Sequence, residues 1–272
     1  MTNAYKISVL TPSRARTTSL ERAVKSIIEL ADKPDTIEVM LGFDNDDTVG
    51  LEFFNDHLQP WLDKNDVNYQ AIGFERLGYT GLNKYYNELA RHTDSDWLMG
   101  WSDDSYMNTQ GWDNKITEHT GEFKLLKVHT HNEHPYSIFP IWPRAWYNLF
   151  GHVSRHQMID AELSHMAYLL GLIHIIDVDV THDRPDLSNK APDTTHKERI
   201  LFEGNPKNPY DFHNPAVTQQ RVADAETVAQ YMASQGLDIS YWEGVKSGKI
   251  DPWIKLREND PNNQCIQISV PR

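Results

Sequence analysis

The chain of 272 residues has little cysteine, no long apolar run and a deficit of positive charge. Its one cysteine, Cys265, cannot form an internal disulfide, so the fold does not depend on an oxidising compartment and we expect a cytoplasmic setting. No apolar run approaches the length of a membrane-spanning helix, and residues 1–6 form no hydrophobic signal region. We therefore expect no membrane insertion.

The charge balance restricts the class of partner. Lys and Arg number 26 against 39 Asp and Glu, a net charge of −13, which argues against a broad grip on the phosphate backbone of nucleic acid. The net charge does not exclude small phosphorylated ligands, because a bound divalent cation can reverse the local sign of charge. The apolar fraction of 39% indicates a folded globular chain with one substantial core.

The first hundred residues alternate between strand and helix patterns. Buried strands are predicted at 7–10, 37–43, 69–74 and 97–101, with amphipathic helices between them. Thr11-Pro12-Ser13 is expected to break the first strand, and Thr18 with Glu21 to form a capping box on the helix that follows. This order predicts an α/β fold with a doubly wound, mostly parallel sheet flanked by helices.

The second half is less regular. Strands are expected at 123–128, 138–141 and 172–180, and helices at 144–150, 160–170 and 216–235. Residues 183–215 are rich in Pro, Asn, Asp and Lys and are interpreted as a long loop. We predict a catalytic domain at 1–185, followed at 186–272 by a lid loop and a helical C-terminal extension.

Polar side chains follow three of the predicted strands. They are Thr11, Pro12, Ser13, Arg14 and Arg16 after the first strand, Asp44 after the second, and Asp103 and Asp104 after the fourth. Ligands of doubly wound sheets bind beyond the carboxyl ends of the strands, so these clusters are expected to converge. Adjacent carboxylates repel each other unless a cation compensates, and Mg²⁺ or Mn²⁺ prefers such oxygens when it also holds a diphosphate. The alternative is a solvated turn with Asp at favoured positions.

The other two clusters suit a nucleotide. The guanidiniums of Arg14 and Arg16 can make planar, bidentate contacts with phosphate or a base edge. Asp44 can accept a hydrogen bond from a base N–H or a ribose hydroxyl. The alternatives are an ordinary turn with solvated arginines and an Asx turn at Asp44.

These motifs together resemble the family 2 glycosyltransferases over about residues 5–182. The resemblance lies in Val-Leu-Thr-Pro-Ser-Arg at the first strand, Asp44 at the second, Asn87 on the third helix and Trp-Ser-Asp-Asp at the fourth strand. It implies the GT-A fold, a nucleotide-sugar donor, an Asp that meets the base, and an acidic motif that grips metal and ribose. The motif here is Ser-Asp-Asp-Ser, so we expect Asp104 to bind the metal and Asp103 to lie toward the ribose. The family often has Arg before the helix Asn; here that position is Tyr86, with Lys84 nearby, and Lys84 is included among the expected donor-binding residues.

The resemblance extends to the acceptor side. Phe150-Gly151-His152 and Asp160-Ala161-Glu162-Leu163 resemble the acceptor stretch of that family with its acidic catalytic pair. We favour Asp160 as the general base because it opens the predicted helix, and Glu162 is the alternative, unless it pairs with a positive side chain. His182 follows the last predicted strand, and in several similar families a histidine there completes the metal site. Capping of the strand end is an equal alternative.

The sequence thus predicts a metal-dependent, inverting glycosyltransferase. Its donor would be a nucleoside-diphosphate sugar, UDP-linked such as UDP-glucose, its cofactor Mn²⁺ or Mg²⁺, and its acceptor a hydroxyl of unknown identity. One alternative is a nucleotidyltransferase, although no Gly-rich phosphate loop follows the first strand. Another is a non-catalytic glycan- or nucleotide-binding module. The histidine-rich segment 129–134 has a ligand pattern of metal-dependent hydrolases, but we interpret it mostly as a polar loop near the acceptor.

Overall fold

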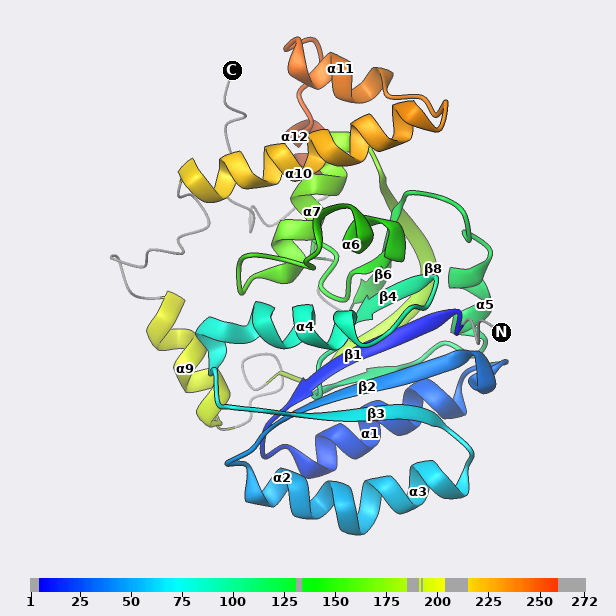
Figure 1. The fold of residues 1–272 in the computed structure, drawn as a ribbon, viewed down its shortest axis with the longest axis vertical. Coiled ribbons are helices and arrows are strands. Elements are labelled where there is room, and N and C mark those ends of the chain that lie inside the picture. Colours follow the sequence, from blue (N-terminus) through cyan, green and yellow to red (C-terminus); the bar gives the residue numbers. More distant parts are fainter. Residues whose placement is uncertain (1–4, 131–133, 185–190, 192, 204–214, 259–272) are drawn as a thin grey trace.

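The computed structural model describes residues 5–130, 134–184, 191, 193–203 and 215–258. Within these residues an eight-stranded sheet has the order β3-β2-β1-β4-β7-β6-β8-β5. Figure 1 shows β3, β2 and β1 side by side at one end of the sheet. The strands are β1 Ile7–Ser13, β2 Ile37–Asp44, β3 Asn68–Phe74, β4 Trp97–Gly100, β5 Ser105–Met107, β6 Leu125–Thr130, β7 Ile141–Pro143 and β8 Ile173–His182.

Pairing in the sheet is mixed. Strands β3, β2, β1 and β4 run parallel to one another, and β6 runs parallel to β8. The short strand β7 is antiparallel to β4 and β6, and β5 is antiparallel to β8. The predicted α/β fold with a mostly parallel, doubly wound sheet is confirmed.

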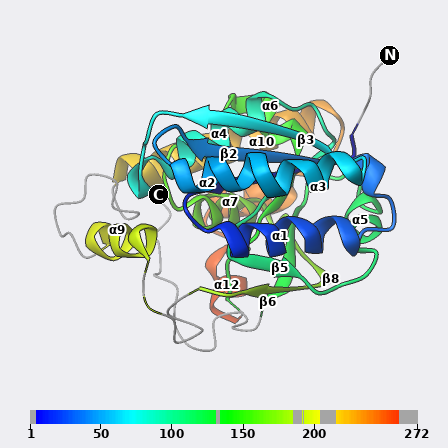
Figure 2. The ribbon, with the colours of Figure 1, turned by 90° about the horizontal axis from the view of Figure 1, so that it is seen from below.

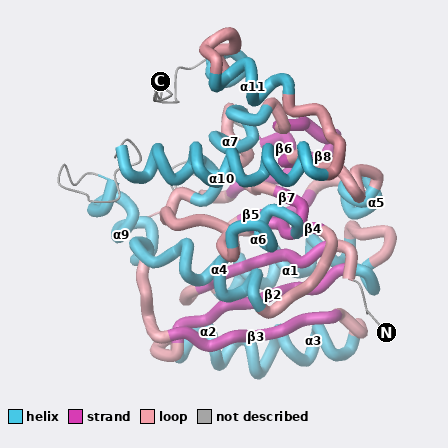
Figure 3. Tube along the Cα trace, turned by 45° about the horizontal axis from the view of Figure 1, so that its top comes forward, coloured by secondary structure: helices cyan, strands magenta, loops and turns pink. Residues whose placement is uncertain are grey.

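Helices cover both faces of the sheet (Figures 2 and 3). They are α1 Thr17–Glu29, α2 Thr48–Phe53, α3 Gln59–Lys64, α4 Leu82–Arg91, α5 Trp112–Thr117, α6 Arg144–Phe150, α7 Ile159–Leu170, α9 Thr194–Glu203, α10 Pro215–Ser234, α11 Ser240–Lys246 and α12 Trp253–Glu258. A π-helical turn, Phe54–Leu58, joins α2 to α3.

Alternation along the strands produces two apolar cores, because successive side chains of a strand point to opposite faces. Ile7 and Val9 of β1 pack in one core with α1, α2, α3 and α5. Leu10 of β1 and Met40 of β2 pack in the other core with α4, α6 and α7. This second core also contains apolar residues of α10, α11 and α12, so the C-terminal extension shares it with the sheet.

Three local predictions were wrong. Strand β1 continues through Thr11-Pro12-Ser13. Among the described strands, this stretch pairs with β2 and no longer with β4, whose pairing ends at Leu10. Pro12, which has no backbone N–H, is tolerated there. The capping box is absent, because helix α1 begins at Thr17, and Glu21 instead pairs with Lys25. The predicted loop 183–215 contains helix α9.

Candidate functional site

The carboxyl ends of β1, β2 and β4 border one pocket with a volume of about 280 Å³. Segments 138–140 and 157–160 and helix α9 contribute to its wall. The predicted site residues that line it are Pro12, Ser13, Arg14, Arg16, Asp44, Asp103, Asp104, Asp160 and His182. The three polar strand ends therefore meet, as the sequence predicted.

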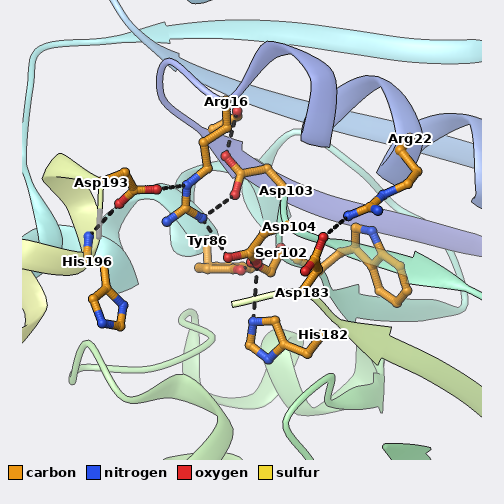
Figure 4. Close-up of polar contacts among 12 residues, drawn as sticks. Arg16, Arg22, Tyr86, Ser102, Asp103, Asp104, His182, Asp183, Asp193 and His196 are labelled. Atoms are coloured by element: carbon orange, nitrogen blue, oxygen red, sulfur yellow. Dashed lines mark hydrogen bonds and ion pairs between the residues drawn. The ribbon is translucent and has the colours of Figure 1, made fainter. Parts of the chain in front are cut away.

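Arg16 is at the centre of the acidic cluster (Figure 4). Its Nη1 donates to Asp103 Oδ1 at 2.7 Å and to Asp104 Oδ2 at 2.9 Å. Its Nε donates to Asp193 Oδ2 at 2.6 Å, and the Ser13 hydroxyl donates to Asp103 Oδ2 at 2.7 Å. One guanidinium thus compensates the repulsion between two adjacent buried carboxylates.

The two carboxylates differ electrostatically. Burial raises the pKa of Asp103, and the charge of Asp104 raises it further against the lowering effect of Arg16. Burial also acts to raise the pKa of Asp104, but hydrogen bonding to His182 and the charges of His182 and Arg16 outweigh it, so this pKa lies below its ordinary value. Asp104 is therefore the more firmly ionised of the two carboxylates.

Strand pairing explains why Asp104 meets His182. Strand β5 lies antiparallel to β8 with Ser105 opposite His182, and the Asp183 N–H donates to the Asp104 carbonyl at 2.8 Å. This places His182 Nε2 at 3.2 Å from Asp104 Oδ1.

The Asp104–His182 pair fits a divalent cation. Two neighbouring ligands of an octahedral ion, each about 2.1 Å from it, lie about 3 Å apart. Among the residues that the structure describes, no group of three or more His, Cys, Asp or Glu side chains forms a metal site. Two protein ligands would leave positions for diphosphate and water, the arrangement that Mg²⁺ uses with nucleotides.

A second polar group lies at the end of β2. Arg14 Nη1 is 2.8 Å from Asp44 Oδ2 and also pairs with Asp46, while the Tyr85 hydroxyl donates to Asp44 Oδ1. Burial and this bond raise the pKa of Tyr85, which stays a donor. A fixed N–H donor and a fixed carboxylate acceptor therefore lie side by side at the pocket wall.

The acidic pair of α7 is divided between two environments. Asp160, in the first turn, lines the pocket and is partly exposed. Burial raises the pKa of the neighbouring Tyr86, as do the charges of Asp103, Asp160 and Asp104, in that order. Glu162 is 2% exposed, does not line the pocket, and lies 3.1 Å from Arg221 Nε through its Oε2.

Two further predicted donor-binding residues do not line the pocket. Thr11 is fully buried within β1, and Lys84 is exposed on α4, whereas its neighbours Tyr85 and Tyr86 are buried and line the pocket. The Tyr86 hydroxyl donates to the Trp101 carbonyl at 2.8 Å and so fixes the end of β4.

Helix α9 lies in the segment predicted to form a lid over the diphosphate, and it supplies further pocket residues, including His196 and Arg199 of that predicted lid. Thr195, His196, Glu198 and Arg199 line the wall, and Asp193 caps the helix by accepting from the His196 N–H at 2.8 Å. Asp before Thr194-Thr195 is an N-cap signal that could have indicated this helix. Lys190 of the predicted lid loop, like residues 131–133 of the histidine-rich segment, lies outside the described residues.

Further contacts attach α9 to the turn before α4. Glu198 accepts from the Tyr79 N–H at 3.2 Å and pairs with Arg76. The rings of Tyr79 and Phe202 lie 5.8 Å apart between centroids. Together with the bond from Arg16 to Asp193, these contacts hold α9 against the pocket.

Comparison with known proteins identifies the fold. No protein-family description and no curated sequence matches the chain. A similar solved structure is the mannosyltransferase PcManGT from Pyrobaculum calidifontis in complex with GDP-Man and Mn²⁺, with 11% identity, a TM-score of 0.53, and coverage of 94% of this chain and 86% of that one.

Residues 1–349 of TarS from S. aureus are also similar. The complex with UDP-GlcNAc has 15% identity and a TM-score of 0.55, covering 80% of this chain and 66% of that one. The complex with UDP has 16% identity and a TM-score of 0.52, covering 89% and 92%. The chain therefore has the GT-A fold that the resemblance implied. Within the described residues, no helix combines the length and apolar character needed to cross a membrane.

Proposed function

We propose that the chain is a metal-dependent, inverting glycosyltransferase that moves a sugar from a nucleoside-diphosphate sugar to an acceptor hydroxyl. The observation that carries the proposal is one pocket that combines the Arg16–Asp103–Asp104 cluster with the carboxylate of Asp160. The similar structures contain GDP-Man with Mn²⁺, UDP-GlcNAc and UDP, which supports a nucleotide-sugar donor.

The Arg14–Asp44 pair supports a base that has a carbonyl beside an N–H, as uracil does. Arg14 would donate to the carbonyl and Asp44 would accept from the N–H. We therefore propose a UDP-linked donor such as UDP-glucose. Guanine has the same two groups, so a comparison of UDP- and GDP-sugars tests this choice.

Asp104 and His182 are the residues that would hold Mn²⁺ or Mg²⁺. When bound, such an ion stabilises the negative charge that grows on the diphosphate leaving group. Arg16 adds fixed positive charge on the same side of the cluster, and Asp103 would accept from the ribose.

Asp160 would take the proton of the acceptor hydroxyl. The acceptor oxygen then forms its bond to the anomeric carbon on the face opposite the diphosphate. The bond from that carbon to the phosphate oxygen breaks, the nucleoside diphosphate leaves, and the configuration is inverted. Among the described residues no hydrogen bond or ion pair engages the Asp160 carboxylate, so it is available for this proton.

A thermal-shift screen tests the donor and the metal together. UDP-glucose, UDP-GlcNAc and GDP-mannose are each added with Mn²⁺ or with EDTA, because a ligand that binds only the native state raises its melting temperature. We expect UDP-sugars to raise it in Mn²⁺ and to have little effect in EDTA. Equal shifts in both conditions contradict metal dependence.

The reaction class is tested by product analysis. A glycosyltransferase releases nucleoside diphosphate, by transfer to an acceptor or slowly to water. Pyrophosphate formed from a nucleoside triphosphate and a sugar phosphate would instead identify a nucleotidyltransferase. Binding of the sugar nucleotide without any release would identify a non-catalytic binding module.

A further inference from the structure

Helix α10 places a buried arginine against α7. Arg221 is 2% exposed, with its Nε 3.1 Å from Glu162 Oε2 and its Nη1 3.0 Å from His165 Nδ1. A guanidinium has only donors, so His165 Nδ1 accepts and the ring proton is on Nε2, which lies 2.9 Å from the Tyr136 hydroxyl. One side chain thus holds two residues that are three positions apart on α7.

Helix α10 also contacts the loop that leads into α7. Asp224 Oδ2 is 3.1 Å from His152 Nε2, in a pair that is 4% and 8% exposed. From the other side, Asn87 of α4 accepts from the N–H groups of Val153 and Ser154 at 2.7 and 3.1 Å and donates to the Ser154 carbonyl at 2.9 Å. Residues 152–154 are therefore held between α4 and α10.

The contacts of Arg221 with α7 and those of residues 152–154 lie on either side of Asp160 in the sequence. This residue lies between loop 151–158 and Glu162, and the backbone of the first turn of α7 determines where its side chain lies. Buried ion pairs seldom add net stability compared with apolar packing, and one established use of them is to fix a particular arrangement. The ion pair of Arg221 with Glu162 and its hydrogen bond to His165 together fix the position of α10 on α7 in a way that apolar contacts alone do not.

We propose that Arg221 is a positioning residue, and that it acts with Asp224 through α7 and loop 151–158 to hold Asp160 toward the pocket. The C-terminal extension is then part of the catalytic apparatus. The inference rests on the proposed function, because the group that it positions is the proposed general base.

The test compares Arg221→Lys with the control Lys246→Gln. Lysine keeps a positive charge near Glu162 but replaces the fork with a single ammonium, so the grip on His165 is lost. The control removes an exposed ion pair between α11 and Glu226 of α10. Three quantities are measured: amide hydrogen exchange across residues 152–163, UDP affinity in Mn²⁺, and the rate at which UDP-glucose is hydrolysed to UDP and glucose.

We expect Arg221→Lys to speed exchange in 152–163 and to lower the hydrolysis kcat about tenfold, with UDP affinity changed less than about twofold. The control should match the wild type in all three quantities. Should Arg221→Lys fail to fold, Asp224→Asn instead weakens the contacts of Asp224 with His152 and Gln220, and the same pattern is expected with a smaller loss.

Two outcomes overturn the inference. An unchanged kcat in a protein whose exchange is faster shows that the contact is structural only. Equal losses of kcat and UDP affinity show general loosening of the fold. If the wild type releases no UDP, the proposed function is contradicted instead. Amide exchange across 152–163 in Arg221→Lys then tests whether Arg221 holds this segment: faster exchange supports that role, and unchanged exchange overturns it.

Discussion

The ion pair of Glu162 makes a quantitative prediction about stability. Burial raises the pKa of this carboxyl from its ordinary 4.5 to about 7; the charge of Arg221 opposes the rise and that of Asp224 adds to it. A group whose pKa is raised on folding favours the native state fully below its unfolded pKa. That contribution is lost as the pH rises through the folded pKa, here between about 4.5 and 7.

The magnitude follows from the two pKa values. Their difference, at about 1.4 kcal/mol per pH unit, corresponds to roughly 3 kcal/mol, and solvent screens little of it because the side chain is 2% exposed. Unfolding entropy of about 2.1 cal/mol/K per residue over 272 residues gives roughly 0.6 kcal/mol/K. The expected change in melting temperature is therefore about 5 °C.

The assay compares urea unfolding of the wild type and Glu162→Gln at pH 4.5 and pH 8. Glutamine keeps the shape and cannot titrate. Carboxyls with lowered pKa values, such as Glu88, act in the opposite direction in both proteins and cancel in the difference. The stability of the wild type relative to the variant should fall by about 3 kcal/mol between the two pH values. Parallel pH profiles would refute the reasoning, because they would mean that Glu162 titrates at its ordinary pKa.

Three further predictions concern the pocket. Asp104→Asn should abolish Mn²⁺-dependent UDP binding while the fold persists, and unchanged UDP affinity in Mn²⁺ would rule out Asp104 as a ligand. Asp160→Asn should lower turnover by about 10²-fold or more with donor affinity nearly intact, and by more than Glu162→Gln does; the reverse order would move the base to Glu162. Amide exchange in residues 193–203 should slow when UDP-glucose and Mn²⁺ are added, whereas unchanged exchange would leave α9 as an ordinary surface helix.

Much of the sheet could be predicted because its signal is local. Strands β1, β2 and β4 are almost entirely buried, and each ends in polar residues, so both the strand and its carboxyl end are visible in the sequence. The convergence of Arg16, Asp44 and Asp104 followed from parallel pairing alone.

The prediction failed for segments whose structure depends on contacts with residues distant in the sequence. Strand β5 is three residues long and exists because it pairs with β8. Helix α9 has a weak apolar pattern and is held by Arg16, Arg76 and Tyr79, which are far away in the chain. Polarity alone could not separate Lys84 from its pocket-lining neighbours, since the direction of a helical side chain depends on which face packs against the sheet.

The path of the chain through the sheet has a consequence for biosynthesis. Strand β5 follows β4 directly in sequence, yet it lies at the far edge of the sheet, where β8 is its one partner among the described strands. A polypeptide leaving the ribosome can assemble β1 to β4 from nearby segments, whereas the loop carrying Asp103 and Asp104 must wait for residues 173–182. Until then the two carboxylates have no histidine beside them. If the proposed function holds, nascent chains shorter than this should bind neither metal nor nucleotide, and binding should begin only late in synthesis.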